Sequence, residues 1–242
     1  MREEIDAFVM MGQSNMAGRG SLADVPPYPE DGTLWMLRCG LWQPLSEPVN
    51  PDRRVVSAQG DHTSGVSLAP AFASAYARAT GRRVGLVPCA YGGSKLDEWQ
   101  EGEPLFDHAV AQTRLALRSA RLMGILWHQG ESDCESPCDV DSYERRFECM
   151  LASFTGALGY TYLPMVMGEL GDFSAGRFPF VPRLNPILRS IAQRHGFGFA
   201  SSEGLTGMAD GMHFDAPSQR VFGKRYYEAY AGMSEEARTP RK

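Results

Sequence analysis

Residues 5–16 read IDAFVMMGQSNM, and they guide the interpretation of the whole chain. The apolar run 5–11 predicts a buried strand that ends at Gly12, and Ser14 follows between two amide side chains. Open α/β sheets bind ligands at the carboxyl ends of their strands, so a Ser at this place is a candidate nucleophile. Taken alone, a Ser in such a turn is more often a turn residue or a helix N-cap. The rest of the chain has to decide between these readings.

The composition is that of an ordinary globular protein. The chain has 242 residues, of which 43% are hydrophobic and 22% charged, enough to bury one large core. We expect a single domain over residues 1–232, with a long loop region on the substrate side at 17–65 and a C-terminal tail at 233–242. The loop region is rich in Pro and Gly, and such long irregular stretches in compact domains usually carry function.

Charge and hydropathy argue against two classes of partner. A net charge of -5 without a cluster of Lys or Arg is not typical of a nucleic-acid-binding surface. No apolar run is long enough to span a membrane. The first residues lack the pattern of a signal peptide, so we expect a cytoplasmic location, with secretion left open if a leader has been removed. No pattern predicts the oligomeric state.

The cysteines and histidines do not predict a metal site. Five scattered Cys residues indicate reduced thiols rather than a disulfide framework. Cys134 and Cys138 are four residues apart, but no further thiolate or imidazole completes a zinc site. His128 and Glu131 suggest a metal pair, yet the HExxH pattern and a third ligand are missing. We expect neither a metal nor a cofactor.

Hydrophobic periodicity predicts strands and helices that alternate five times. This alternation requires a parallel sheet with helices on both faces, so the predicted fold is an α/β, three-layer α/β/α sandwich with a five-stranded parallel, flavodoxin-like sheet. Residues 33–37 are a candidate extra strand, Pro186 is expected to break or delay its helix, and the tail is expected to be frayed. The predicted strands are 5–11, 84–89, 122–127, 162–167 and 197–200, and the predicted helices are 67–80, 104–117, 140–154, 182–195 and 217–231.

Four polar segments can meet at the carboxyl edge of this sheet. Nucleophilic acyl transfer needs a hydroxyl, an imidazole that takes its proton and a carboxylate that orients the imidazole. Ser14 can supply the hydroxyl and His213 the imidazole. Asp210 precedes His213 by three residues, a spacing that places both side chains on one side of a turn. The segments are 12–15, 92–94, 129–131 and 210–213.

The same segments also contain donors for an oxyanion. The backbone N–H groups of Ser14 and Gly92 and the side-chain amide of Gln129 are the candidates. Each segment has an ordinary alternative, since Asp-x-x-His can be a helix cap with a surface imidazole, Gly92-Gly93 a turn and Glu131 a cap of the next helix. The presence of all four segments at the ends of elements favours the functional interpretation.

The sequences of the four segments resemble the motifs of the SGNH hydrolases, and within them those of carbohydrate esterase family 6 and the sialate O-acetylesterase-like branch. The resemblance covers residues 8 to about 227, weakly in the loops, and only the joint set is specific. It rests on MGQSNMAG at 11–18, YGGS at 91–94 with Trp99, WHQGESD at 127–133 and DGMHF at 210–214.

The resemblance implies a metal-free serine esterase that removes O-acetyl groups from carbohydrates through an acetyl-enzyme. Ser14 would be the nucleophile, His213 the general base and then acid, and Asp210 the orienting acid. The Ser14 N–H, Gly92 and Gln129 would form the oxyanion hole. The substrate would be an acetylated xylo-oligosaccharide or an O-acetylated sialic acid.

Two positions leave alternatives open. The wider superfamily has Asn where this chain has Gln129, so the longer side chain must be held differently. Glu131 competes with Asp210 as the triad acid, because some relatives are described with that Glu in the role. We favour Asp210, since the Asp-x-x-His spacing supplies the geometry by itself, and Glu131 would then support loops around the site.

Other residues near the segments are candidate substrate contacts, and Trp35, Trp42 and Trp99 could either stack on a sugar or anchor loops. Two other functions stay open on this scaffold. One is a different short-chain acyl esterase or thioesterase, and the other is a catalytically silent carbohydrate-binding protein. The candidate substrate contacts are Gln13, Asn15, Gly93 and Trp99.

Overall fold

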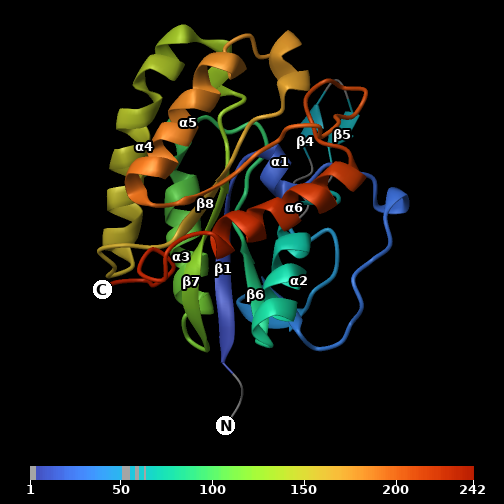
Figure 1. Cartoon of the computed structure of the whole chain (residues 1–242), viewed down its shortest axis with the longest axis vertical. Coiled ribbons are helices and arrows are strands. Elements are labelled where there is room, and N and C mark those ends of the chain that lie inside the picture. The colour runs from blue at the N-terminus through green and yellow to red at the C-terminus, as the bar shows by residue number, and fades with distance from the viewer. Residues whose placement is uncertain (1–3, 51–54, 58–59, 63) are drawn as a thin grey trace.

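The computed structural model describes residues 4–50, 55–57, 60–62 and 64–242. Among these residues the central element is a seven-stranded sheet with the order β3-β2-β6-β1-β7-β8-β9 (Figure 1). β3 is antiparallel to β2, and the other neighbours are parallel. The strands are β1 (Ile5–Gly12), β2 (Leu34–Arg38), β3 (Leu41–Pro44), β6 (Val84–Pro88), β7 (Ala120–His128), β8 (Met165–Gly168) and β9 (Gly198–Ala200), beside a separate antiparallel pair, β4 (Val55–Ser57) and β5 (Gly60–His62).

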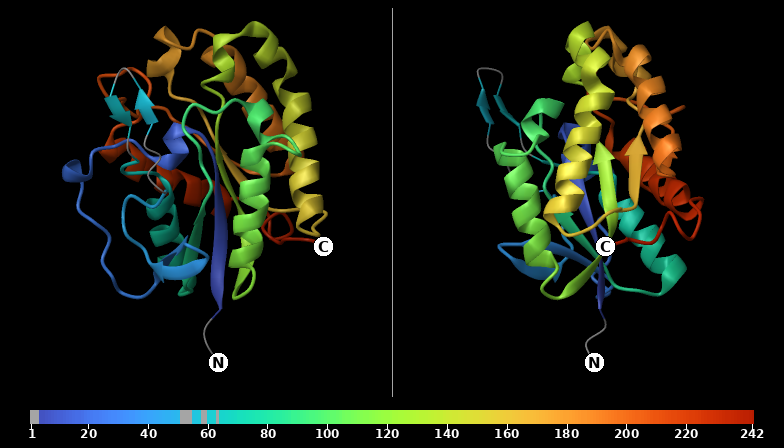
Figure 2. Two further views of the ribbon diagram at one scale, coloured as in Figure 1. Left: turned by 180° about the vertical axis from the view of Figure 1, so that it is seen from behind. Right: turned by 90° about the vertical axis from the view of Figure 1, so that its left-hand side faces the viewer.

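The helices cover both faces of the sheet, which confirms the three-layer α/β/α sandwich. α2 and α6 pack on one face, and α3, α4 and α5 pack on the other (Figures 1 and 2). No helix in the described part of the chain is long and apolar enough to cross a bilayer. The helices are α1 (Ser14–Ala17), α2 (Ala69–Thr80), α3 (Pro104–Ala116), α4 (Pro137–Ala157), α5 (Val181–His195) and α6 (Ala216–Ala231).

The central strand β1 explains why the sheet is covered twice. All of its side chains are buried, and they alternate between two apolar cores. Phe8 and Met10 face the core under α2 and α6, whereas Val9 and Met11 face the core under α3, α4 and α5. A parallel strand that is buried on both faces reads as a nearly continuous hydrophobic run, which is the pattern of residues 5–11.

The predicted number of five strands was wrong, although the five predicted strands are present in the flavodoxin-like order β6-β1-β7-β8-β9. The candidate strand at 33–37 is β2, and β3 was missed. β3 is short, and its end residues are exposed, so its sequence has no hydrophobic alternation. A tight turn at Cys39 and Gly40, both with positive φ, returns the chain to pair with β2. Part of the expected loop region, β2 and β3, therefore extends the sheet, while 51–54, 58–59 and 63 lie outside the described residues.

Two other local expectations were wrong. α5 continues through Pro186 from Val181 to His195, because its buried apolar face holds the helix against the core despite the lost hydrogen bond. The tail is not frayed at its end, since the backbone of Arg241 exchanges hydrogen bonds with Tyr162. The hydroxyl of Tyr162 also donates to the Ala237 carbonyl at 2.9 Å.

Candidate active site

Three loops meet where β1, β6 and β7 end, at the end of the sheet opposite the N-terminus (Figure 1). Backbone hydrogen bonds tie them together, from Gln13 N–H to the His128 carbonyl at 2.9 Å and from Tyr91 N–H to the Gly12 carbonyl at 2.8 Å. Gly12 has a φ of +129°, and a Cβ there would lie 2.0 Å from the His128 carbonyl oxygen. Only Gly permits this close approach, which places the next residues against the end of β7.

Ser14, His213 and Asp210 form a continuous hydrogen-bonded chain. The Ser14 Oγ lies 2.8 Å from His213 Nε2, and His213 Nδ1 lies 2.6 Å from Asp210 Oδ2. Ser14 begins α1, directly after β1, while Asp210 and His213 lie in the turn that precedes α6. The fold thus brings together residues that are 199 positions apart in the sequence. The arrangement is that of a nucleophile, its base and the acid that orients the base.

A local turn fixes the Asp210 carboxylate for this contact. Its Oδ1 accepts hydrogen bonds from the backbone N–H groups of Met212 at 2.9 Å and His213 at 3.1 Å. Burial would raise the pKa of Asp210, but the hydrogen bonds from His213 and the backbone outweigh it and lower the pKa. Asp210 is therefore a carboxylate at neutral pH, as its role toward an imidazole requires.

Burial shifts the pKa of His213 downward, because it disfavours the charged imidazolium. It lowers the pKa of the imidazole, and this effect outweighs Asp210, whose hydrogen bond and charge raise the pKa. The lowered pKa keeps the ring neutral at pH 7, so that Nε2 can accept the proton of Ser14 while Nδ1 donates to Asp210.

Asn15 connects the nucleophile segment to the base segment. Its side-chain amide donates to the Met212 carbonyl at 3.2 Å and accepts from the Phe214 N–H at 3.0 Å, so it holds the backbone on both sides of His213. The second N–H of this amide donates to Glu131 Oε1 at 2.6 Å. Asn15 lines the pocket, but its amide is committed to the protein, so its predicted substrate contact stays a prediction.

Glu131 supports this connection and does not hydrogen-bond to His213. The side chain is buried, with Oε1 3.3 Å from Nε2 of His128 and Oε2 without a partner in the described part of the chain. Burial would raise the pKa of Glu131, but the charge and hydrogen bond of His128 and the bond from Asn15 outweigh it and lower the pKa. The geometry thus favours Asp210 over Glu131 as the triad acid.

The Ser14 and Gly92 backbones flank the space in front of the nucleophile. The Ser14 N–H donates to no acceptor in the described ranges of the chain, as expected for the first residue of a helix. A Cβ on Gly92 would lie 3.6 Å from the Ser14 Cβ and 2.4 Å from the Arg19 guanidinium. The absence of a side chain at 92 therefore keeps the space beside Ser14 open. Gly93 also lines the pocket.

Gln129 does not fit its predicted role as an oxyanion donor. Its side chain is buried and does not line the pocket. Its Nε2 donates to Asp133 Oδ2 at 2.5 Å and to the Ser94 carbonyl at 3.0 Å, so both hydrogens are used inside the protein. Gln13 lines the pocket, but its Oε1 accepts long hydrogen bonds, including one from the Ser132 N–H at 3.3 Å.

The loop tryptophans are packing residues. Trp99 is fully buried, and its indole N–H donates to Ser94 Oγ at 3.0 Å, so the predicted substrate contact by Trp99 was wrong. Trp35 and Trp42 lie on β2 and β3 and pack against the core. A Trp in an apparent loop gives no sequence signal that separates an anchor from a sugar platform, because that depends on the neighbouring strands.

The pocket in front of Ser14 contains charges that the sequence motifs did not predict. Lys95 pairs with Asp139 at 2.8 Å, and Arg19 donates to the Gly18 carbonyl at 2.8 Å. Arg177 makes no ion pair with any described residue, and its guanidinium lies 5.8 Å from the ring centroid of Phe178. Only its position in the fold reveals Arg177, since its loop carries no motif. Among the described residues no cluster of three metal-ligating side chains occurs.

Comparisons with known proteins point to a family of esterases. Residues 4–232 match the model of a family described as carbohydrate esterase, sialic acid-specific acetylesterase. A probable carbohydrate esterase of Arabidopsis thaliana is 29% identical over 241 residues, covering 92% of this chain and 89% of that protein.

Solved structures share the fold. The X-ray structure of an Arabidopsis thaliana protein superposes with a TM-score of 0.79 and 22% identity, covering 96% of this chain and all 100% of that one. NanS superposes with a TM-score of 0.73 and 18% identity, covering 94% and 96%. A carbohydrate acetylesterase from Xanthomonas citri gives a TM-score of 0.63 and 19% identity, covering 96% of this chain and 57% of that one.

The resemblance to SGNH hydrolases and to carbohydrate acetylesterases among them is thereby confirmed. The match of residues 4–232 shows the family. The chain belongs to the carbohydrate esterase family of sialic acid-specific acetylesterases, and it is a carboxylic ester hydrolase that acts as a carbohydrate O-acetylesterase.

Proposed function

We propose that the protein hydrolyses carbohydrate O-acetyl esters by a serine mechanism in which Ser14 is the nucleophile. The observation that carries this proposal is the hydrogen-bonded chain from Ser14 Oγ through His213 to Asp210, at 2.8 and 2.6 Å, in a pocket open to solvent. Asp210 holds the imidazole in the tautomer that leaves Nε2 free to accept a proton.

The reaction proceeds in two halves. His213 Nε2 takes the hydroxyl proton while Ser14 Oγ attacks the acetyl carbonyl, and the C=O electron pair moves to the oxygen. The N–H groups of Ser14 and Gly92 stabilise this oxyanion. The C–O bond to the sugar then breaks, and His213 gives its proton to the leaving sugar oxygen. A water molecule attacks the acetyl-enzyme with His213 as base again, and acetate leaves with Ser14 restored.

The charges of the pocket support an acidic sugar as the carrier of the acetyl group. Three cationic side chains, Arg19, Lys95 and Arg177, line the pocket beside two acidic ones, Glu131 and Glu135. Arg177 has no acidic partner among the described residues, and Arg19 lies beside Gly92. A guanidinium binds a carboxylate through two parallel hydrogen bonds, whereas a neutral sugar offers no such group. We infer that an O-acetylated sugar acid such as sialic acid is preferred to acetylated xylo-oligosaccharides.

Acetate release tests the mechanism. Wild type and Ser14→Ala are compared on 4-nitrophenyl acetate, O-acetylated sialic acid and acetylated xylo-oligosaccharides. We expect the substitution to lower kcat by roughly a million-fold, as loss of the nucleophile does in a serine protease. Equal rates for both proteins contradict the serine mechanism. Sugar binding without acetate release would favour the silent binding protein, and faster turnover of octanoyl than acetyl esters would favour a different acyl esterase.

Arg177→Gln tests the substrate class, with Arg183→Gln, whose side chain is exposed on α5 and does not line the pocket, as the matched control. We expect Arg177→Gln to raise KM for the acidic sugar about tenfold or more, because a lost charge-assisted contact of about 1.4 kcal/mol or more changes binding by that factor. KM for the neutral xylo-oligosaccharide should stay unchanged. An equal effect on both substrates contradicts carboxylate recognition by Arg177.

A further inference from the structure

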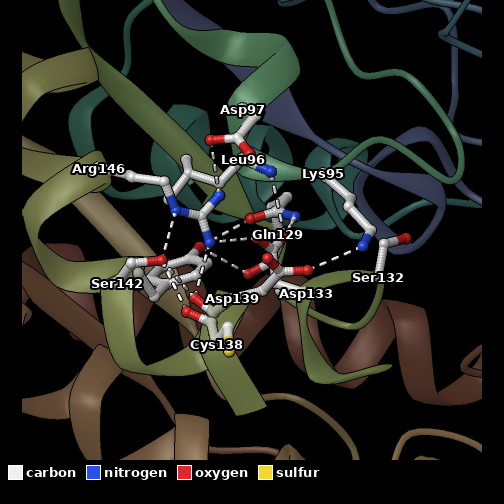
Figure 3. A network of polar contacts seen from close by, with 12 residues as sticks. Lys95, Leu96, Asp97, Gln129, Ser132, Asp133, Cys138, Asp139, Ser142 and Arg146 are labelled. Carbon is white, nitrogen blue, oxygen red and sulfur yellow. Dashed lines mark hydrogen bonds and ion pairs between the residues drawn. The ribbon is translucent and has the colours of Figure 1, made fainter. Parts of the chain in front are cut away.

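A buried carboxylate that the proposed mechanism does not use lies behind the pocket. Asp133 has no exposed surface, and its Oδ1 accepts from Arg146 Nη2 at 2.8 Å. Its Oδ2 accepts from Gln129 Nε2 at 2.5 Å and from the Leu96 N–H at 3.0 Å. Figure 3 shows these three partners around Asp133, drawn from three separate segments of the chain. Every partner is a donor, so each hydrogen bond favours the carboxylate, although burial outweighs them and raises the pKa of Asp133 above its usual value.

The amide of Gln129 extends this contact toward the pocket. Its second N–H donates to the Ser94 carbonyl at 3.0 Å, while its Oε1 accepts from the Tyr143 hydroxyl at 2.8 Å. Both ends of the amide are therefore fixed, and its orientation depends on Asp133 on one side and on Tyr143 of α4 on the other. The Ser94 carbonyl is held two residues after Gly92.

The glycine loop, residues 92–96, is anchored at three of its residues by the segment that follows β7. Ser132 Oγ donates to the Gly93 carbonyl at 3.1 Å, Gln129 donates to the Ser94 carbonyl, and Asp133 accepts from the Leu96 N–H. At the outer edge, Lys95 pairs with Asp139 (Figure 3). Gly92, whose N–H the mechanism requires, is the first residue of this loop.

Stability alone does not account for this arrangement. A carboxylate and a guanidinium lose their hydration when they are buried, and an apolar pair of similar volume is often as stable or more so. What a fully paired buried carboxylate supplies is a fixed geometry for the groups that donate to it. At this site those groups belong to the loop beside the nucleophile.

We propose that Asp133 is a positioning residue that acts through Gln129 and Leu96 to hold the glycine loop, so that the Gly92 N–H faces the oxyanion. This inference rests on the proposed serine mechanism. Gln129 then serves the oxyanion indirectly, which explains how a side chain outside the pocket lining belongs to the third motif segment.

Asp133→Asn tests the proposal. The Asn side chain keeps the shape of Asp, but its NH₂ group cannot accept a hydrogen bond, so at least one of the three donors around this position loses its acceptor. We expect kcat to fall about 100-fold, the effect of one lost oxyanion donor, with KM nearly unchanged. The acid limb of the pH profile should stay in place, since His213 is untouched. Inactivation by an organophosphonate, which also places an oxygen in the oxyanion hole, should slow by a similar factor.

Asp97→Asn is the matched control. Asp97 also accepts from Arg146, at 3.0 Å, but its side chain is 65% exposed and contacts neither Gln129 nor the glycine loop through a hydrogen bond. We expect its kcat to stay within twofold of wild type. A folded Asp133→Asn protein with kcat within threefold of wild type, or with a raised KM at unchanged kcat, overturns the proposal.

Tyr143→Phe keeps the test decisive if Asp133→Asn does not fold. It removes one hydroxyl from α4, which donates to the side-chain and backbone oxygens of Gln129 at 2.8 and 3.1 Å and accepts from the Trp127 indole at 3.4 Å. We expect a several-fold loss of kcat at constant KM, and an unchanged kcat contradicts the proposal. Hydrogen exchange of the glycine loop gives a readout without activity, since the loop amides should exchange faster in either variant, and unchanged exchange overturns the anchoring. Absence of Ser14-dependent hydrolysis in wild type contradicts the proposed function instead.

Discussion

The loop that carries the base and the loop that carries Gly92 are held by different kinds of contact. Asp210 orients His213 through hydrogen bonds that span two or three residues, in a turn where its side chain is 33% exposed. The glycine loop is held by buried side chains further along the chain: Gln129 lies 35 positions after Ser94, and Asp133 lies 37 positions after Leu96. The contacts of the base loop are local in the sequence and partly exposed to solvent, whereas those of the glycine loop are distant in the sequence and buried.

This difference predicts where substitutions act. A change in the local turn removes a contact to the base itself and should alter both the rate and its pH dependence. A change in the buried support leaves the base untouched and should alter the rate alone. Asn15 and Glu131 lie between these cases, because they hold the backbone around His213 through contacts that are buried and distant in the sequence.

The largest change in kcat is expected when the triad acid is replaced. Asp210→Asn should lower kcat by about 10⁴-fold, because the amide favours the wrong imidazole tautomer. Glu131→Gln should lower kcat only about tenfold, the effect of about 1.4 kcal/mol on the barrier, since it weakens the Asn15 contact without reaching His213. The measurement is kcat on 4-nitrophenyl acetate for both variants. The reverse ranking would move the triad acid to Glu131.

An intermediate effect is expected at Gly92. Gly92→Ala places a methyl group 3.6 Å from the Ser14 Cβ and against the Arg19 guanidinium. We expect kcat/KM for acetyl esters to fall about 100-fold, as when one oxyanion donor is lost, because the methyl occupies the space that the acetyl oxygen enters.

The double variant Gly92→Ala with Arg19→Ala separates the two contacts of that methyl group. Removal of Arg19 relieves only the collision with the guanidinium, so the loss should persist. Full recovery of kcat/KM in the double variant would show that displacement of Arg19, rather than the space beside Ser14, caused the loss.

The smallest expected effect is a shift of the acid limb of the pH profile of kcat/KM. Because burial lowers the pKa of His213, kcat/KM of wild type should reach half of its plateau below pH 6.5 and fall about tenfold per pH unit beneath that point. In Asp210→Asn the charge that raises this pKa is gone, so the limb should move to still lower pH. A limb above pH 6.5 in wild type contradicts the burial argument.

The fold was predictable to the extent that burial leaves a periodic signal. β1 and its parallel neighbours are apolar on both faces, and the helices show apolar residues at helical spacing. β3 carries no such signal, because it lies at the sheet edge with its ends exposed. Pro186 was expected to interrupt a helix, but packing of the whole apolar face of α5 outweighs one lost hydrogen bond.

The site was predictable where its geometry is local. Gly12-Gln13-Ser14 follows a strand, and Asp210 lies three residues before His213, so both fragments can be read from spacing. The roles of Gln129 and Trp99 could not be read in this way. Whether a Gln amide faces a pocket or a buried carboxylate depends on residues such as Asp133 and Tyr143, which only the packing of α4 brings close.

The sequence by itself determined the alternating α/β order, the identity of the nucleophile segment and the Asp-x-x-His pair, because each depends on contacts within a few residues. Tertiary structure alone decided that Glu131 contacts Asn15 and His128, that Gln129 lies behind the pocket, and that Arg177 lies on its wall. The physical reason is the same in each case. Local spacing fixes which side chains share a turn, but burial and long-range hydrogen bonds fix where a side chain points.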